Sequence, residues 1–552
     1  MLKFLKYMAL TIIILLIVIA GYLVYLSKAH SILPLHTEAK VKNKEFVDSL
    51  TYKIDNCWIH KETNGLWDMY LEGNPLNRGI IAGKLSDSLI VWQERAFVNQ
   101  IHRIIPSNFY LGFLKYIVAC FNVNIHKAIP EEYKEEIYGI SQSATHEYDF
   151  IGTPYQRILN YHGAHDLGHM LQNLGMVGCS SFALWDKKTK DGQLLVGRNF
   201  DFYVGDEFAK HKMVIFIKPD SGYCHAFVSW GGMMGAVSGM NIKGLTVTIN
   251  AANSNITLKT ATPVAILARN ILQYASNINE AIAIATKFNV FVSEQFLIGS
   301  ASENKAIVIE KTPKSQAIYS VNTNYIINTN HYQSKENKDL PETIKQKNQT
   351  ASGYRNQRLT DLIINRNGLT YTNMAEILRD TLGLENSDIG LGNENSINQL
   401  IAHHSIIFAP ARNIMWVSTS PFQEGKYVAY DLNKIFKMGV PLNGKEVSSK
   451  ELEIAADSSF IKNAYKRYSN FSKIRIKINE GKASTDDINV LISLNPEFYY
   501  TYEISGDFYK SRKEFKTAKK YYLMALKHNL PGQNERNRIA KKYATASKMI
   551  ED

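Results

Sequence analysis

Two apolar segments separated by a polar turn constrain this chain more than any other feature of its sequence. Residues 179–185 and 193–202 are rich in residue types that favour strands, and residues 186–192 between them are mostly Asp, Lys, Thr and Gly. Two segments of this kind with a turn between them predict a β-hairpin. The hairpin brings the start of the first strand close to the end of the second.

Three polar residues of this hairpin form a candidate reactive cluster. Cys179 opens the first strand, and Arg198 and Asp201 lie near the end of the second, so we expect the three side chains to lie close together. A thiol reacts as its thiolate, and it needs a proton acceptor and a positive or hydrogen-bonding environment to do so at neutral pH. The cluster supplies both. The alternative is a buried structural thiol, since free cysteine is among the most buried residue types.

The sequence Gly-Cys-Ser-Ser-Phe at 178–182, followed by Gly-Arg-Asn-Phe-Asp at 197–201, resembles the autoproteolytic N-terminal-nucleophile (Ntn) hydrolases of the penicillin acyltransferase family. Choloylglycine (bile salt) hydrolases and acid-ceramidase-type amidases are more distant relatives. The resemblance implies that the precursor cuts itself between Gly178 and Cys179. The new terminal residue then carries the nucleophilic thiol and also the base, its own α-amine, whose reference pKa is about 7.7 to 8.0.

The same resemblance implies three further site residues. Asn250 and Asn330 end strand-like segments and sit beside the nucleophile in the family's pattern. Because a donor about 3 Å from a developing oxyanion contributes roughly 2.7 to 4 kcal/mol, Asn250 is the oxyanion-hole candidate, and Asn330 would position the substrate amide or the new amine. The family also places an arginine of residues 352–359 next to the thiol, and the spacing favours Arg355 over Arg358. Otherwise the asparagines serve strand-end turns and the arginine lies on a helix surface.

The order of elements after Cys179 predicts an α+β fold. Strands, then helices, then more strands suit two stacked antiparallel sheets with helices outside, and the family has this arrangement as a four-layer αββα sandwich. The predicted strands are residues 179–185, 193–202, 212–219, 223–230, 245–250, 295–300, 306–311, 317–321, 325–329, 404–408 and 415–418, and the predicted helices are 263–276 and 278–288.

The length of 552 residues exceeds what one hydrophobic core usually serves. We expect a membrane anchor at 1–35, a mainly helical pro-segment at 36–178, an Ntn-hydrolase domain at 179–440 and a helical region at 441–552. The family resemblance implies that the pro-segment stays bound as the short chain after cleavage.

The amino terminus predicts the anchor. Residues 8–26 carry no charge and would span about 28 Å as a helix, close to the thickness of a bilayer core. Lys3 and Lys6 precede them, which leaves the short terminus in the cytoplasm and the catalytic domain on the outer side of the membrane. A cleaved signal peptide is the alternative, although the apolar run is longer than usual for one.

Cysteines and histidines raise two further questions. Export would allow one disulfide, for instance between Cys57 and Cys120, which sequence alone cannot assign. In the predicted helix from residue 155, three histidines share one face, so a zinc site has to be considered. No zinc-protease signature accompanies them, and we expect no metal and no cofactor. The residues concerned are His162, His165, Asp166 and His169.

The carboxy-terminal region has its own character. Gly506, Tyr509, Ala518, Tyr522 and Ala525 follow the spacing of small and aromatic residues in one tetratricopeptide-like helical hairpin; an ordinary helix pair is the alternative. These helices are a candidate surface for a protein partner.

Charge adds little to the assignment of function. The net charge is +12, and the last 52 residues hold 12 Lys or Arg against 6 Asp or Glu, a contribution of +6. This suits an acidic partner or an anionic lipid surface, or else a solvated basic helix face. No motif indicates nucleic-acid binding.

The leading hypothesis is a membrane-anchored, self-processing cysteine amidase or acyltransferase. Its substrate would be an acyl amide or thioester, and an exported site near a bilayer makes a lipid-like acyl group a reasonable guess. The rival from another class is a non-catalytic envelope scaffold that displays the helical region to a protein partner. A secreted metallohydrolase is a third reading.

Overall fold

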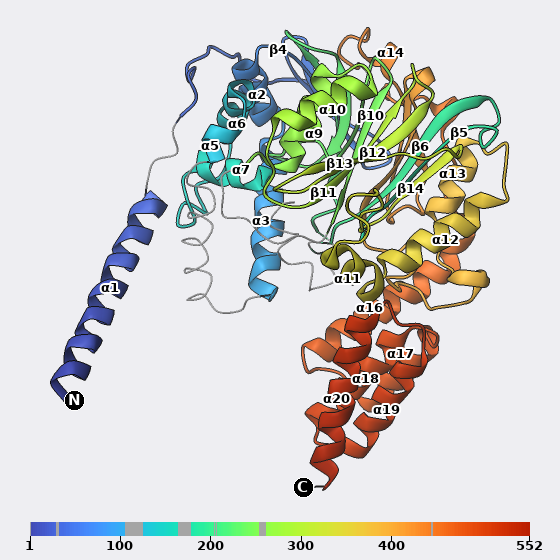
Figure 1. Ribbon diagram of the computed structural model, residues 1–552. Helices are drawn as coiled ribbons and strands as arrows, with labels where there is room; N and C mark the ends of the chain where they lie inside the picture. The colour runs from blue at the N-terminus through green and yellow to red at the C-terminus, as the bar shows by residue number, and fades with distance from the viewer. Residues whose placement is uncertain are drawn as a thin grey trace.

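The computed structural model describes residues 2–28, 33–104, 125–163, 178–203, 205, 207–252, 261–442 and 445–551. Two β-sheets are stacked at the centre of the molecule, helices cover their outer faces, and the carboxy-terminal helices form a separate group at one end (Figure 1). This is the α+β arrangement that the sequence predicts.

The larger sheet has 11 strands among the described residues, in the order β1-β2-β3-β4-β7-β8-β9-β10-β11-β12-β13. Neighbouring strands are antiparallel except β4 and β7, which are parallel. The strands are β1 (Glu45–Asp48), β2 (Thr51–Ile54), β3 (Cys57–Lys61), β4 (Trp67–Gly73), β7 (Met213–Pro219), β8 (His225–Ser229), β9 (Ser238–Asn241), β10 (Leu245–Ala251), β11 (Glu294–Ser300), β12 (Lys305–Lys311) and β13 (Gln316–Tyr319).

The smaller sheet has the order β14-β5-β6-β15-β16-β17 among the described residues. Strands β5 and β6 are the predicted hairpin, and they lie inside this sheet. The strands are β5 (Ser180–Asp186), β6 (Gly192–Asp201), β14 (Tyr325–Asn328), β15 (Ala402–Ala409), β16 (Ile414–Ser418) and β17 (Tyr427–Asp431).

Apolar side chains from both sheets fill the space between them. Val196 and Phe408 of the smaller sheet and Phe216 and Leu297 of the larger one belong to this buried cluster. Strands that are buried on both faces have nearly continuous apolar sequences. This explains why the apolar pattern predicted most of the strands after Cys179.

Helices close the outer face of each sheet. Helices α9 (Val264–Tyr274) and α10 (Ile278–Lys287) lie on the larger sheet, and α12 (Ser352–Ile364) and α13 (Tyr371–Leu378) lie on the smaller one. Helix α11 (Pro341–Gln349) precedes α12, and the short helices α14 (Leu432–Ile435) and α15 (Ser458–Phe460) follow the smaller sheet.

The prediction of a mainly helical pro-segment is wrong for its first part. Residues 45–73 form four strands that extend the larger sheet, and β4 pairs with β7 along seven residues, from Trp67 opposite Met213 to Gly73 opposite Pro219. The helices that follow are α2 (Pro75–Leu85), α3 (Asp87–Ile104), α5 (Ile125–Ala128), α6 (Glu131–Ser141) and α7 (Pro154–His162). The pro-segment is therefore built into the central sheet.

Buried charges join the pro-segment to the rest of the chain. Glu136 of α6 lies 3.3 Å from Arg78 of α2 and 3.5 Å from Arg269 of α9, and all three side chains are nearly inaccessible to solvent. Removing one partner of a buried ion cluster is strongly destabilising. This cluster therefore holds the segment before residue 178 firmly against the segment after it.

The amino-terminal helix α1 (Leu2–Lys28) forms as expected, and it lies apart from the sheets in Figure 1. The membrane crossing predicted for it is not supported: within the described residues, no helix combines the length and apolar character that a membrane span requires.

The carboxy-terminal helices are α16 (Lys466–Asn479), α17 (Thr485–Leu494), α18 (Tyr499–Ser511), α19 (Phe515–Lys527) and α20 (Gln533–Glu551). Helices α18 and α19 form the predicted hairpin. Gly506 is needed there because a Cβ at that position would lie 2.5 Å from the Tyr522 ring. The helices share a buried aromatic core of their own that includes Phe471 and Tyr499.

Candidate active site

The hairpin of β5 and β6 brings a thiol and a guanidinium into contact. Ser181 of β5 pairs with Arg198 of β6, and Cys179 lies immediately before β5. The Arg198 Nη2 atom is 3.6 Å from the Cys179 Sγ atom, and both side chains are fully buried. The closeness expected from the sequence is therefore present in the structure.

The Arg198 side chain is fixed by several acceptors. Its Nη1 donates to the Ser238 Oγ at 2.5 Å and to the Val237 carbonyl at 2.8 Å. Its Nε donates to the Asn250 Oδ1 at 3.3 Å, and its Nη2 also donates to the Ile249 carbonyl. A guanidinium held this way presents a fixed positive charge to the sulfur.

The thiol is not activated in the intact chain. Burial raises the pKa of Cys179 to about 11 because the protein around it cannot solvate a thiolate; Arg198 acts in the opposite direction, and Asp201 adds to the rise. The sulfur is therefore protonated at neutral pH. The base that the family resemblance implies, the α-amine of Cys179, is still part of a peptide bond.

A glutamine that sequence reasoning missed holds the carbonyl group before Cys179. The Gln399 Nε2 donates to the Gly178 carbonyl at 2.6 Å and to the Asp201 Oδ2 at 3.3 Å. The Gly178 N–H donates in turn to the Asp201 main-chain carbonyl at 3.1 Å. A Cβ on Gly178 would lie 2.8 Å from the Gln399 amide, so glycine is needed for this contact.

Asp201 is a buried carboxyl group close to its titration point at neutral pH. Burial raises its pKa to about 7, against the lowering effects of Arg355 and Arg198. Within the described part of the chain, its Oδ1 has no hydrogen-bond partner. A carboxyl group with this pKa can accept or release a proton at neutral pH.

The two predicted asparagines lie beside this cluster, but their amides are already occupied. The Asn250 Nδ2 donates to the Ser181 Oγ at 3.0 Å and to the Asn328 carbonyl at 2.9 Å. The Asn330 Nδ2 donates to the Ala251 carbonyl at 2.9 Å. In the intact chain, the side-chain amide on the Gly178 carbonyl is that of Gln399 and not that of Asn250.

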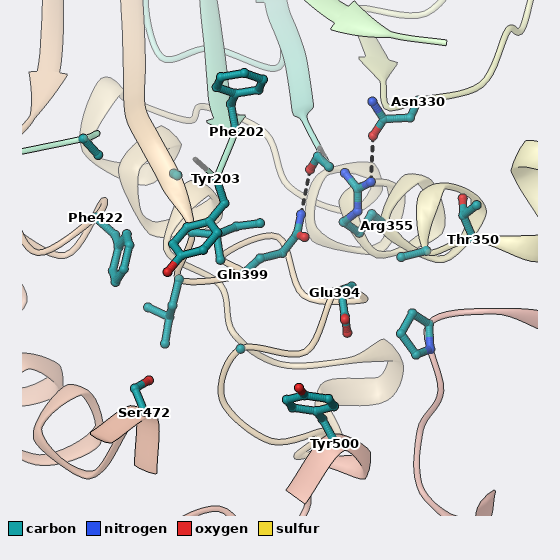
Figure 2. Close-up of a pocket in the computed structure, with 18 of the residues that line it drawn as sticks. Phe202, Tyr203, Asn330, Thr350, Arg355, Glu394, Gln399, Phe422, Ser472 and Tyr500 are labelled. Carbon is teal, nitrogen blue, oxygen red and sulfur yellow. Dashed lines mark hydrogen bonds between the residues drawn. The ribbon is translucent and has the colours of Figure 1, made fainter. Parts of the chain in front are cut away.

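Of the two candidate arginines, Arg355 reaches the site. Its Nη1 donates to the Cys179 carbonyl at 2.6 Å and to the Ser180 Oγ at 2.8 Å, and its Nη2 donates to the Asn330 Oδ1 at 2.7 Å. Figure 2 shows the bond between Arg355 and Asn330. Arg358 instead forms a two-point ion pair with Asp380 at 2.8 Å for both bonds. The preference for Arg355 agrees with this geometry.

The histidine pair of β15 lies behind Arg198. The His404 Nε2 is 2.9 Å from the Ser238 Oγ that also accepts from Arg198, and the His403 Nδ1 is 2.9 Å from the His404 Nδ1. Burial lowers the pKa of His403 to about 3 and lowers that of His404 as well. Both rings are therefore neutral at neutral pH.

The zinc reading finds no support in the described residues, which contain no group of three or more potential metal ligands. His162 uses both ring nitrogens within the protein: its Nδ1 contacts the Ile158 carbonyl at 2.8 Å, and its Nε2 accepts from the Met234 N–H at 3.0 Å. His165, Asp166 and His169 lie outside the described residues. Cys57 is a buried free thiol, and Cys120 lies outside the described residues.

A cavity of about 1200 Å³ opens beside the Gly178 carbonyl. Gly178, Asn330, Arg355 and Gln399 form part of its lining, and the carboxy-terminal helices form the opposite part. Figure 2 shows Gln399 and Arg355 projecting into the same space as Tyr500. Cys179 lies behind Gly178, fully buried, so a ligand in the cavity meets the carbonyl before it meets the sulfur.

A family model covers much of this site. Residues 187–422 match the model described as acyl-coenzyme A:6-aminopenicillanic acid acyl-transferase, which supports the family resemblance read from the sequence. The matched segment contains Arg198, Asp201, Asn250, Asn330 and Arg355. It starts after Cys179 and covers less than half of the chain.

Individual relatives are more distant. A protein from Archaeoglobus fulgidus described as uncharacterized is 25% identical over 274 residues, which cover 46% of this chain and 45% of that protein. The chain thus spans about half the length of this curated relative.

Three solved structures are also similar, each with a TM-score of 0.31. They are the Caenorhabditis elegans ortholog of N-acylethanolamine-hydrolyzing acid amidase (14% identity, 42% of this chain and 93% of that chain) and two variants of the conjugated bile acid hydrolase from Clostridium perfringens (16% and 17% identity, 49% and 50% of this chain, 96% and 98% of those chains). We draw no functional conclusion from similarities this weak.

Proposed function

We propose that this chain, whose residues 187–422 match the penicillin acyltransferase-like family model, is an enzyme that hydrolyses or transfers acyl groups held in amide bonds. The family match supports that general class of reaction. The finer part of the proposal is that Cys179 is the nucleophile and that the chain first cuts itself between Gly178 and Cys179. The geometry around those two residues supports this part.

Self-cleavage would proceed by an N-to-S acyl shift. The Cys179 sulfur attacks the Gly178 carbonyl carbon, the C–N bond breaks, and the thiol proton moves to the departing nitrogen. Asp201, whose pKa is near 7, is the candidate carrier for that proton. Water then hydrolyses the thioester, which leaves a carboxylate on Gly178 and a free thiol and α-amine on Cys179.

Gln399 would act on the first of these steps. Its amide donates to the Gly178 carbonyl oxygen at 2.6 Å, the atom that gains negative charge when sulfur attacks. A donor already aimed at that oxygen stabilises the tetrahedral intermediate without reorganisation. This contact is the single observation that most favours self-cleavage at this bond.

Turnover would reuse the same sulfur. The free α-amine takes the thiol proton, the thiolate attacks the substrate carbonyl, and an acyl-enzyme forms and passes its acyl group to water or to an amine. Arg198 and Arg355 contribute positive charge around the sulfur, and Asp201 orients the terminal residue. Asn250 and Asn330 are the candidates for the oxyanion donor and for substrate positioning. No step in this scheme calls for a cofactor.

The decisive experiment is the intact mass of purified wild-type protein beside that of Cys179→Ala. The proposal expects two chains in the wild type, the second beginning at Cys179, and one intact chain in the variant. Cys224→Ala, which removes a half-buried thiol away from the site, is the matched control and should still be cut. A single intact wild-type chain would instead favour the scaffold hypothesis, and a cut that survives Cys179→Ala would show that the Cys179 thiol does not carry out the cleavage.

A further inference from the structure

The carboxy-terminal helices supply the outer wall of the cavity beside Cys179. Ser469, Ser472 and Arg475 come from one face of α16, Tyr500 comes from α18, and Arg538 comes from α20. Figure 2 shows Ser472 and Tyr500 across the cavity from Gln399 and Arg355. The helical region is thus part of the candidate active site and not only an appendage.

A fixed loop holds this wall in place. We call residues 388–400 the docking loop; it contains Gln399 and leads into β15 of the smaller sheet. The Leu391 N–H donates to the Asn495 Oδ1 at 3.0 Å, and the Asn495 Nδ2 returns a bond to the Leu391 carbonyl at 2.8 Å. The Asn395 Nδ2 donates to the Asn529 Oδ1 at 2.6 Å.

Close packing leaves the loop little freedom to move away. A Cβ on Gly390 would lie 2.4 Å from the Phe498 main-chain nitrogen, and one on Gly392 would lie 2.7 Å from the Tyr468 ring. The docking loop is therefore packed directly against the main chain at Phe498 and the Tyr468 ring, with no space for a side chain between them.

Both walls of the cavity carry polar groups. On the sheet side, apolar side chains such as Phe202 and Val292 lie among polar ones such as Lys212. On the helix side, hydroxyl, amide and guanidinium groups lie beside the Glu535 carboxylate and the Phe498 ring. Hydrogen-bonding groups therefore face the cavity from the helices as well as from the side of Gly178.

Several of the polar groups on the helix side are available to a ligand. Within the described residues, the hydroxyl groups of Ser469, Ser472 and Tyr500 have no hydrogen-bond partner in the protein. Covering them with an apolar chain would remove them from water without replacing their hydrogen bonds, which is unfavourable. A ligand that carries its own donors and acceptors incurs no such penalty.

We infer that the substrate is an acyl amide with a peptide-sized, multiply hydrogen-bonding portion that lies against the carboxy-terminal helices. The inference rests on the proposed function and narrows its substrate class. A fatty-acyl amide would leave the helix wall unsatisfied, so the lipid-like substrate expected from the sequence is replaced by a polar one. The cavity volume of about 1200 Å³ lies above the usual range of about 300 to 1,000 Å³ for small-molecule sites, so the cavity has room for a ligand of peptide size.

The test compares amides that differ either in the acyl group or in the amine to which it is attached. Fully processed protein is assayed with p-nitroanilides of acetic acid, octanoic acid and a polar tripeptide, and with octanoyl and acetyl groups attached to the amine of the same tripeptide. The acetyl anilide tests the proposed function alone, because this small amide does not reach the parts of the cavity wall that lie far from the sulfur. Its turnover should be lost in Cys179→Ala.

We expect at least one tripeptide-bearing amide to exceed the octanoyl anilide in kcat/KM by tenfold or more. Tyr500→Phe and Ser472→Ala should each raise KM for that amide roughly three- to tenfold, and should raise KM for the acetyl anilide by less. Tyr543→Phe in α20 and Ser493→Ala in α17, in the same helical region but outside the cavity lining, are the matched controls and should change KM for neither substrate.

Two results would overturn the inference while leaving the proposed function intact. One is an octanoyl anilide turned over as well as any tripeptide amide, with acetyl anilide turnover still dependent on Cys179. The other is an equal effect of Tyr500→Phe on the tripeptide and acetyl substrates. Acetyl anilide turnover that persists in Cys179→Ala would count against the proposed function itself.

Discussion

Replacing Gln399 tests the proposed chemistry at the bond where it begins. Gln399→Met keeps the length of the side chain and removes the amide that donates to the Gly178 carbonyl at 2.6 Å. If this amide stabilises the oxyanion of self-cleavage, its loss raises the barrier of that step. The folded structure should persist, because the new side chain fills nearly the same volume.

The magnitude follows from the geometry of the donor. Loss of one oxyanion donor costs about 2.7 to 4 kcal/mol, or 10²- to 10³-fold in rate. Gln399 shares its amide with the Asp201 Oδ2 at 3.3 Å, so we expect the lower end of that range, about 100-fold slower self-cleavage. The carbonyl of Gly178 also loses its partner, which destabilises the precursor by about 1 to 3 kcal/mol.

The assay is a time course of precursor and product masses after synthesis in a cell-free system. Gln423→Met is the control for lost stability, because Gln423 is also buried and donates to a main-chain carbonyl, that of Leu378 at 3.3 Å, away from the cut. We expect the control to be cut at the wild-type rate. A folded Gln399→Met protein that is cut as fast as wild type would refute the assigned role.

Three further outcomes are expected. Gly178→Ala should slow self-cleavage because its Cβ would displace the Gln399 amide, and the mass time course should show little additional effect of this change in a Gln399→Met background; a fully additive effect would contradict the shared mechanism. Arg355→Lys should impair amide turnover because it loses the fork that joins Cys179, Ser180 and Asn330, whereas Arg358→Ala should lower thermal stability and retain self-cleavage; the reverse result would reassign the two arginines. Burial raises the pKa of Asp201 from 3.8 to about 7, so the folded state holds a proton that the unfolded state releases, and this group lowers stability progressively from about pH 4 to pH 7. The free energy of unfolding of Asp201→Asn should therefore exceed that of the protein with Asp201 by up to about 4 kcal/mol at pH 8 and by nothing at pH 3. The measurement is urea unfolding with Cys179→Ala in both proteins, so that each stays a single uncut chain. A constant difference across that pH range would show that the carboxyl group does not titrate this way.

The sequence predicted the parts of the site that depend on local pattern. The hairpin that joins Cys179 and Arg198 is formed by residues close in the chain, and its apolar strands and polar turn are visible in a short window. The positions of Asn250, Asn330 and Arg355 came with the family resemblance. The structure brings all three beside the hairpin.

The parts that were missed depend on contacts between distant residues. Gln399 meets the Gly178 carbonyl across 221 positions of sequence, and no short motif surrounds it. Strands β1–β3 are only four or five residues long, and together with β4 they gain their place from the pairing of β4 with β7, which a local pattern does not reveal. The shared cavity likewise arises from the docking of separate regions.

The parallel pairing of β4 with β7 has a consequence for the protein after cleavage. The two strands would then belong to different polypeptides, so reassembly from denaturant would become a bimolecular event and the unfolding midpoint would fall on dilution. The uncut Cys179→Ala chain would refold independently of its concentration. The two halves of the mature molecule would have assembled while they were still one chain. Their association would then persist mainly because the two chains dissociate slowly.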